Sequence, residues 1–262
     1  MPDWIAVIVL GIIEGITEFL PVSSTGHLLL AEHALHVNKS DLFNVVIQCG
    51  AVLAVLPLFP ERLRQFAFQW REKATQDYGL KILVAFGLTG FGGLILEKNH
   101  FKLPETVLPV ALALIVGGVL FLVVERWLRG RTLSNDVTWT IVVAVAIGQL
   151  VAAIFPGTSR SGATILFALI LGLGRPAATE FSFLVGIPTM LAAGGLKIFE
   201  AFHHPAKGPA ENWSLLLLSA VVAAVVSFFA VKWLLRYVQT HTFNAFGWYR
   251  VVAGILIFVL MK

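Results

Sequence analysis

The feature that most constrains this chain is a series of long apolar runs that contain very little charge. Of its 262 residues, 58% are hydrophobic and only 13% are charged, whereas soluble domains carry roughly 25% charged residues. A helix needs about 20 mostly apolar residues to cross a bilayer. The sequence therefore predicts an all-α polytopic membrane protein. Six transmembrane spans are expected, at roughly 42–60, 78–96, 106–125, 177–199, 214–236 and 245–261.

The apolar pattern is first interrupted by the polar sequence EGITEFLPVSSTGH, which starts at Glu14. Glu14 and Glu18 are four residues apart, so a helix presents both carboxylates on one face. Pro21 ends that helix, because the residue before a proline avoids the α region. The hydroxyl residues that follow are typical of a helix cap, and we expect a new helix to begin near Gly26. Residues 4–37 are therefore interpreted as a re-entrant helix–break–helix hairpin, buried in protein or lining a polar cavity.

A second polar break, PGTSRSGAT, starts at Pro156 and adds a cation, Arg160. It lies between two further short apolar pieces, so residues 137–173 are interpreted as a second re-entrant hairpin. A guanidinium offers a planar fork of donors that suits phosphate, and the start of a helix also attracts anions. If the two breaks meet, Arg160 faces Ser24 and His27 across one pocket. The alternative is a purely structural pairing of Arg160 with Glu14 or Glu18, which would only neutralise charge in the fold.

The two halves of the chain follow the same plan. They match at an offset of 135 around the breaks, which pairs Glu14 with Gln149, Pro21 with Pro156 and Ser24 with Ser159. Three spans per half is an odd number, so the second half is expected to lie upside down relative to the first. We therefore predict one membrane domain, 1–262, made of inverted repeats 1–130 and 131–262, with the two hairpins meeting near the membrane midplane.

Basic residues between the apolar runs predict the orientation. One face is expected to carry Arg62, Arg64, Arg71, Lys73, Arg126, Arg129, Arg131, Arg175 and Arg236, and the other Lys98, Lys102, Lys197, Lys207 and Lys262. The bias makes the first face cytoplasmic, because cytoplasmic loops are rich in Lys and Arg. Both termini and the mouth of the first hairpin then face outward. The modest net charge of +4 indicates membrane orientation and not binding of nucleic acid.

The two polar sequences closely resemble the signature motifs of the undecaprenyl-diphosphate phosphatases, the bacitracin-resistance family of bacterial inner membranes. The match covers EGITEFLPVSSTGH and PGTSRSGAT, and the length and layout of the whole chain also fit. The resemblance implies hydrolysis of undecaprenyl diphosphate to undecaprenyl phosphate and inorganic phosphate, which recycles the lipid carrier for peptidoglycan synthesis. It also implies a site open to the periplasm, and leaves open whether the protein forms a homodimer.

The resemblance also implies the site residues. The catalytic residues carry over to Glu14, Glu18, Ser24, His27 and Arg160. The expected phosphate-binding neighbours are Ser23, Thr25, Gly26, Ser159, Ser161, Gly162 and Thr164. Members of the family depend on a divalent cation, Mg²⁺ or Ca²⁺, which Glu14 and Glu18 would hold.

Two mechanisms and a second class of function remain open at this stage. In one mechanism Ser24 attacks the terminal phosphorus, with His27 as general base and later as activator of water. In the other, water attacks directly and Ser24 is only a ligand. Because inverted repeats with broken helices are also the architecture of secondary transporters, a carrier of an anionic lipid or small anion is the alternative function.

Two more ionisable residues lie within predicted spans. Arg250 belongs to the last span and Glu180 to the fourth. A structural ion pair, or extension of the side chain to the membrane interface, is the expected role of each.

Overall fold

The structure, a computed structural model, describes residues 2–99, 101, 103, 106–203 and 212–260. Within these ranges the chain is helical apart from loops and one isolated bridge between Ser134 and Leu173. The elements are α1 (Asp3–Thr17), α2 (Ser24–Leu35), α3 (Asp41–Val55), the 3₁₀ helix η1 (Leu56–Leu58), α4 (Pro60–Phe68), α5 (Lys73–Lys98), α6 (Val107–Trp127), α7 (Trp139–Ile154), α8 (Arg160–Ile170), α9 (Arg175–His203), α10 (Trp213–Thr240) and α11 (Asn244–Leu260).

Five helical segments of the described chain are long and apolar enough to cross a membrane. They are α3 continued through η1, α5, α6, α9 and α10. The all-α, multi-pass class predicted from the apolar runs is therefore confirmed. The sixth predicted span, 245–261, corresponds to α11, which at 17 residues is shorter than the other five, and its last residue lies outside the described part. The predicted positions of Lys102, Lys207 and Lys262 also lie outside it.

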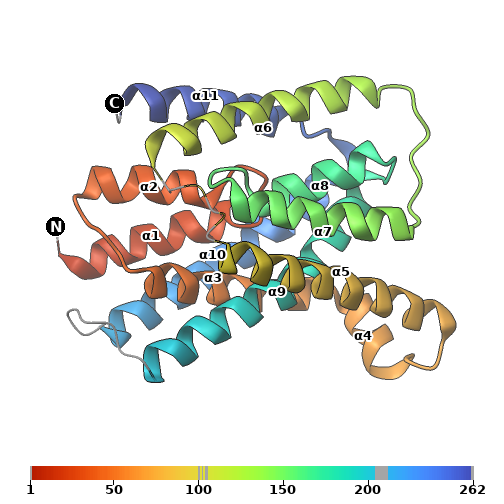
Figure 1. Ribbon diagram of the computed structural model, residues 1–262, viewed down its shortest axis with the longest axis horizontal. Coiled ribbons are helices and arrows are strands. Elements are labelled where there is room, and N and C mark those ends of the chain that lie inside the picture. The colour runs from red at the N-terminus through yellow and green to blue at the C-terminus, as the bar shows by residue number, and fades with distance from the viewer. Residues whose placement is uncertain (1, 100, 102, 104–105, 204–211, 261–262) are drawn as a thin grey trace.

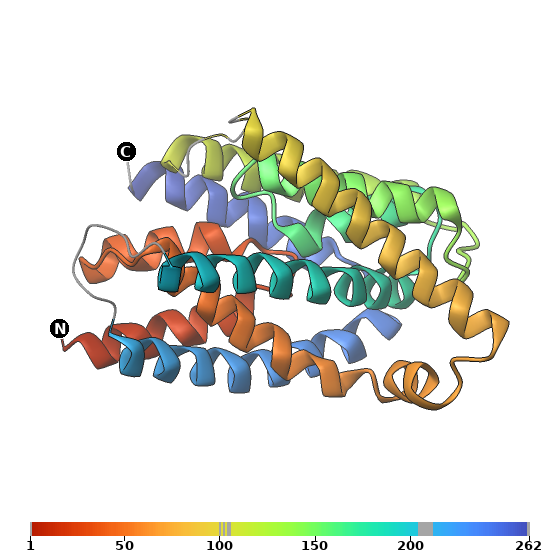
Figure 2. The ribbon, with the colours of Figure 1, turned by 60° about the horizontal axis from the view of Figure 1, so that its bottom comes forward.

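Each polar break separates two short helices that run antiparallel to each other. The first hairpin consists of α1 and α2, and the second of α7 and α8. Figure 1 shows that the two hairpins occupy opposite ends of the molecule and that each turns near its middle. The start of α1 and the end of α11 lie at the same end, and α4 lies at the opposite end (Figures 1 and 2).

The two breaks share a cap geometry that corrects the predicted alignment of the halves. Ser23 caps α2 and Ser159 caps α8, each accepting a hydrogen bond from the backbone N–H three residues on. These two serines are 136 residues apart, so the predicted pairing of Ser24 with Ser159 is wrong by one. The second break has an extra residue, Gly157, with φ of +90°. A Cβ there would come within 2.7 Å of the Val110 carbonyl oxygen, so the inserted residue is glycine where the turn approaches α6.

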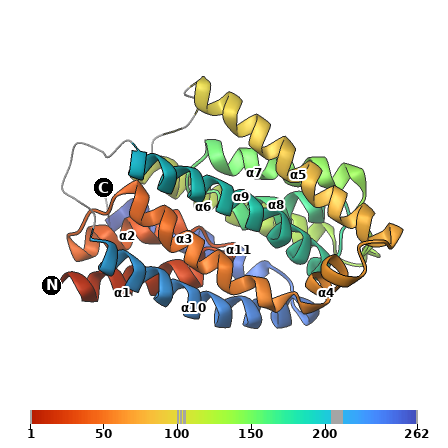
Figure 3. The same ribbon diagram turned by 90° about the horizontal axis from the view of Figure 1, so that it is seen from below.

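Helix α10 packs against both α1 and α3 (Figure 3), and its contacts with α1 support the first hairpin. Small residues allow the close approach: a Cβ on Gly15 would be 2.7 Å from the Ala223 carbonyl oxygen, and one on Gly50 would be 2.4 Å from that of Ala220. Such small-residue contacts are typical of packing between membrane helices.

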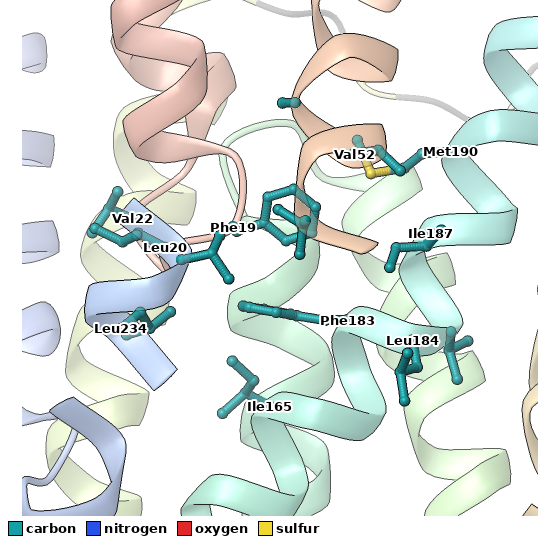
Figure 4. Packing of buried hydrophobic residues seen from close by; sticks show 14 of the residues in the cluster. Phe19, Leu20, Val22, Val52, Ile165, Phe183, Leu184, Ile187, Met190 and Leu234 are labelled. Atoms are coloured by element: carbon teal, nitrogen blue, oxygen red, sulfur yellow. The ribbon is translucent and has the colours of Figure 1, made fainter. Parts of the chain in front are cut away.

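An aromatic pair in the core connects the first break to α9. The rings of Phe19 and Phe183 meet edge to face with centroids 4.9 Å apart, and both side chains are fully buried (Figure 4). On the same helix, Glu180 accepts hydrogen bonds from Arg62 (2.7 Å) and Tyr78 (3.2 Å). The structural ion pair expected for Glu180 is therefore confirmed.

Candidate active site

The two breaks meet at the carboxylate of Glu18. The Ser24 hydroxyl, at the start of α2, donates to Glu18 Oε2 at 2.6 Å. Arg160, at the start of α8, donates through Nη2 to Glu18 Oε1 at 3.1 Å. One carboxylate therefore joins two helix N-termini that belong to opposite halves of the chain. Since the positive end of each helix dipole lies there, the electrostatics at this point favour an anion.

Both helix starts are made by serines in an unusual backbone conformation. Ser23 has φ of 74° and ψ of 99°, and Ser159 has φ of 68° and ψ of 116°. Positive φ is rare for residues other than glycine and costs of order 1–3 kcal/mol. Such strain persists where the surrounding structure over-determines it, often at functional sites. At both breaks the serine with the strained backbone is also the residue that caps the helix.

Two other hydroxyls of the second break, those of Ser161 and Thr164, bond to backbone carbonyls. The Ser161 hydroxyl is directed at the carbonyls of Glu18 (3.4 Å) and Leu20 (3.2 Å). The Thr164 hydroxyl bonds within α8, to the carbonyls of Arg160 (2.9 Å) and Ser161 (3.1 Å). Ser161 and Thr164 are fully buried. Their contacts are therefore structural, and the phosphate-binding roles expected for them remain predictions.

Two ionisable groups beside Glu18, Glu14 and Arg160, have unused hydrogen-bonding capacity. Glu14 is fully buried, and neither of its carboxylate oxygens has a hydrogen-bond donor among the described residues. The Nη1 atom of Arg160 is buried and likewise has no acceptor there. Because a buried ionic group without a partner is costly, this arrangement fits a ligand that supplies both. An anion would accept from Arg160, and a cation or proton would satisfy Glu14.

The carboxylates of Glu14 and Glu18 suit a cation, such as Mg²⁺, that takes only part of its ligands from the protein. In the described part of the chain, no group of three or more His, Cys, Asp or Glu side chains is placed to hold a metal. The described residues therefore form no metal site built from protein ligands alone. Mg²⁺, however, is often held by one or two carboxylates together with substrate phosphates and water. The two unused oxygens of Glu14 match that donor set, whereas both oxygens of Glu18 already accept hydrogen bonds.

His27 lies in the first turn of α2, as predicted, but its ring contacts groups other than Ser24. Its Nδ1 is 2.7 Å from the Ser23 carbonyl oxygen, and its Nε2 is 2.6 Å from the Tyr249 hydroxyl. The carbonyl can only accept, so Nδ1 carries the proton and, in the neutral ring, Nε2 accepts from the tyrosine. Glu18, and not His27, therefore accepts the Ser24 hydroxyl in this structure.

Arg250 contradicts its predicted role. It is fully buried, and the described residues place no carboxylate within ion-pair distance of it. Its guanidinium instead donates to backbone carbonyls of both breaks and of α6, namely those of Pro21, Ala113, Leu114, Gly157 and Thr158, at 2.8–3.4 Å. Arg250 therefore holds the two turns against each other.

The sequence contains a signal that Arg250 must bond to groups outside its own helix. It is the only charged residue of α11, so no acid on its own helix can pair with it. An arginine of this kind inside an apolar helix must find acceptors elsewhere. The contact between Tyr249 and His27 spans 222 residues, and nothing local in the sequence points to it.

A polar cavity of about 800 Å³ lies beside the first turn of α2. Thr25 lines it, together with charged residues from α2, the α2–α3 loop, α3, α5 and α9: Glu32, Lys39, Asp41, Glu97 and Lys197. Thr25 is only partly buried, in contrast to Ser23 and Ser24. The cavity therefore gives water and polar solutes a route toward the first break.

The chain is similar to known proteins over almost its whole length. The family described as bacitracin resistance protein BacA matches residues 7–256 of the chain. A relative from Rhizobium etli, named undecaprenyl-diphosphatase, is 48% identical over 256 residues, covering 97% of this chain and 96% of the relative. A relative from Xanthomonas axonopodis pv. citri with the same name is also 48% identical over 256 residues, with the same coverage. These matches span both polar breaks.

Proposed function

This chain belongs to the bacitracin resistance protein BacA family, and on that premise we propose that it hydrolyses undecaprenyl diphosphate to undecaprenyl phosphate and inorganic phosphate. The named activity of its relatives supports this assignment. The physical observation that carries it is the link from Ser24 through Glu18 to Arg160. A nucleophile, a proton acceptor and an anion-binding cation meet there, at the N-termini of two helices.

The diphosphate carries several negative charges that must be neutralised before a nucleophile approaches. The unused Nη1 of Arg160 and the two helix N-termini supply positive potential at that point. A Mg²⁺ or Ca²⁺ ion bound by Glu14, beside Glu18, would supply further charge neutralisation to the phosphate oxygens. The partner implied by this chemistry is an anionic polyprenyl lipid.

In the first step Ser24 Oγ attacks the terminal phosphorus and its proton passes to Glu18. The new bond is Oγ–P, and the bond that breaks joins the terminal phosphorus to the bridging oxygen. That oxygen leaves with undecaprenyl phosphate. The 2.6 Å contact between Ser24 and Glu18 supports Glu18 as the acceptor, in place of the His27 role expected from the sequence, because a general base must lie within hydrogen-bond reach.

In the second step water attacks the phosphoserine. Its oxygen binds phosphorus, the Oγ–P bond breaks, one water proton passes to His27 Nε2, and the Glu18 proton returns to Ser24. The Ser23 carbonyl accepts the Nδ1 proton, which leaves Nε2 unprotonated. Nε2 takes the water proton in place of its hydrogen bond from Tyr249, and it gives that proton to solvent when phosphate leaves. Direct attack by water, with Ser24 as a ligand only, is the competing mechanism, and it forms no phosphoenzyme.

We further propose that the protein lies in the bacterial inner membrane as an inverted repeat, with its site open to the periplasm and both termini on that side. Two observations support this: the hairpins enter from opposite ends (Figure 1), and α4, which carries Arg62 and Arg64, lies at the end opposite the start of α1, as expected of a cytoplasmic end. In a variant without Cys49, a cysteine at Gln76 should react with a thiol reagent only from the cytoplasm. A cysteine at Ser40 should react from the outside, and the reverse pattern would invert this orientation.

Phosphate release from undecaprenyl diphosphate by the purified protein in detergent tests the activity. It should require Mg²⁺ or Ca²⁺, stop with chelator, and be lost in Ser24→Ala and Arg160→Ala. Arg160→Lys should restore little, because the planar fork is lost. A rapid acid quench should trap a labelled phosphoenzyme in the wild type but not in Ser24→Ala. Folded wild-type protein that releases no phosphate would refute the proposal and favour transport of an anionic lipid.

A further inference from the structure

An apolar groove of about 550 Å³ lies along α6, on the side that borders α7 and α8. Its outer part is formed by exposed side chains of α6, among them Leu108, Leu112 and Val116, which are 51–55% exposed. Its inner wall comes from α8, where Ala163 and Leu166 are buried. Figure 1 shows α6 running alongside the second hairpin. In a membrane protein, such exposed apolar side chains face the lipid, so the groove opens sideways into the bilayer.

The inner end of this groove is the second polar break. Pro156, Thr158 and Gly162 line it there, and so does the guanidinium-bearing Arg250. Among the described residues that line the groove, Thr158 and Arg250 are the only ones with polar side chains. Arg250 bonds only to backbone carbonyls in the described part of the chain, which satisfy its donors but leave its positive charge unneutralised. The groove is therefore apolar along its length and cationic at one end.

We propose that this groove holds the prenyl tail of the substrate next to its diphosphate. This inference rests on the proposed function. The charge pattern matches a lipid with a long apolar chain and an anionic head. At the inner end of the groove, Thr158 and Gly162 each lie two residues along the chain from Arg160, the proposed phosphate ligand. A volume of this size, within the roughly 300–1,000 Å³ of small-molecule sites, takes one segment of a long chain. The rest of the tail then continues into the bilayer.

Gly117 lines the groove and lies directly against Arg250, which contacts both breaks. A Cβ on Gly117, which lines the groove in α6, would be 2.3 Å from Arg250 Nη2. The wall of the groove therefore rests directly on the residue that holds both breaks. A tail seated against α6 lies along the same surface that positions the polar turns, so a filled groove places the head group at the break.

Bulky substitutions in the groove test the inference through chain-length preference. The readout is the ratio of kcat/KM for undecaprenyl diphosphate to kcat/KM for farnesyl diphosphate, whose short tail contacts less of the groove. Val116→Trp and Leu112→Trp should each lower this ratio by about tenfold or more, because the displaced chain loses apolar burial. The matched control is Val123→Trp, on the same helix, equally exposed (58%) and outside the groove, and it should leave the ratio unchanged.

An unchanged ratio in both groove variants would overturn the inference, provided that they elute as the wild type does in size exclusion. Equal losses on both substrates would also overturn it, because the groove would then act only on the shape of the break.

A measurement without turnover separates this inference from the proposed function. A polyprenyl phosphate with a photoreactive group in its tail should label α6 and α8 in the wild type, and Val116→Trp should reduce that labelling. Labelling elsewhere, or labelling that phospholipid suppresses as well as unlabelled polyprenyl phosphate does, would overturn the tail site even in an active enzyme. Groove labelling in a protein that releases no phosphate would support the tail site and refute the phosphatase.

Discussion

A single added methyl group at Gly186 should disable the site without unfolding the protein. Gly186 is a buried residue of α9, and a Cβ built on it would be 1.7 Å from Arg160 Nη1 and 2.8 Å from Arg160 Cζ. Real Cβ atoms essentially never come within 3.0 Å of another heavy atom. In Gly186→Ala the guanidinium must therefore leave its position. It then loses the 3.1 Å hydrogen bond to Glu18 and withdraws Nη1 from the phosphate.

The magnitude follows from that lost contact. A hydrogen bond to a charged group contributes about 1.5–3 kcal/mol, and each 1.36 kcal/mol is a tenfold change in rate. We expect kcat/KM for phosphate release to fall between about tenfold and about a hundredfold. Alanine is favoured over glycine within a helix by about 1 kcal/mol, so the fold itself is not expected to be lost.

Gly195→Ala, on the same helix, is the matched control, since a Cβ there meets nothing within 4 Å. Both variants should show melting temperatures close to that of the wild type in detergent, and only Gly186→Ala should lose activity. Activity of Gly186→Ala within about twofold of Gly195→Ala would refute the packing argument. It would mean that the position of Arg160 against α9 is not needed for turnover.

Three further variants test the other groups of the site. Glu18→Gln keeps the shape of the side chain but not its basicity, and should lower kcat by about 10²–10⁴; steady-state rates near those of the wild type would exclude Glu18 as the proton acceptor. Glu14→Gln should raise the Mg²⁺ concentration for half-maximal activity by about tenfold or more, and an unchanged metal titration would place the cation elsewhere. Arg250→Met leaves buried carbonyls of both breaks without a donor, at about 1–3 kcal/mol each. Its melting temperature should fall by at least about 5 °C, and a stable variant would contradict the role of Arg250 as the link between the turns.

Local signals in the sequence predicted most of the fold. Apolar runs, the proline at position 21 and the serine caps are properties of short segments, and helices begin and end within a few residues of the predicted bounds. The predicted alignment of the two halves failed by one residue, at Gly157, because an inserted residue in a turn leaves the helices on both sides unchanged. Only the equivalent caps at Ser23 and Ser159 reveal it.

The sequence by itself determined which chemical groups this protein has and which segments carry them. Two carboxylates one turn apart, a hydroxyl cluster and an arginine at a helix start follow from local spacing and helix capping, and they predict an anion site. Only the tertiary structure decided which groups touch. Glu18 and Arg160 are 142 residues apart, and the packing of two hairpins from opposite ends brings them together. The turn of the first hairpin pairs Ser24 with Glu18, six residues away. The packing of distant segments leaves Arg250 among backbone carbonyls, because such contacts depend on the shape of whole helices and not on residue spacing.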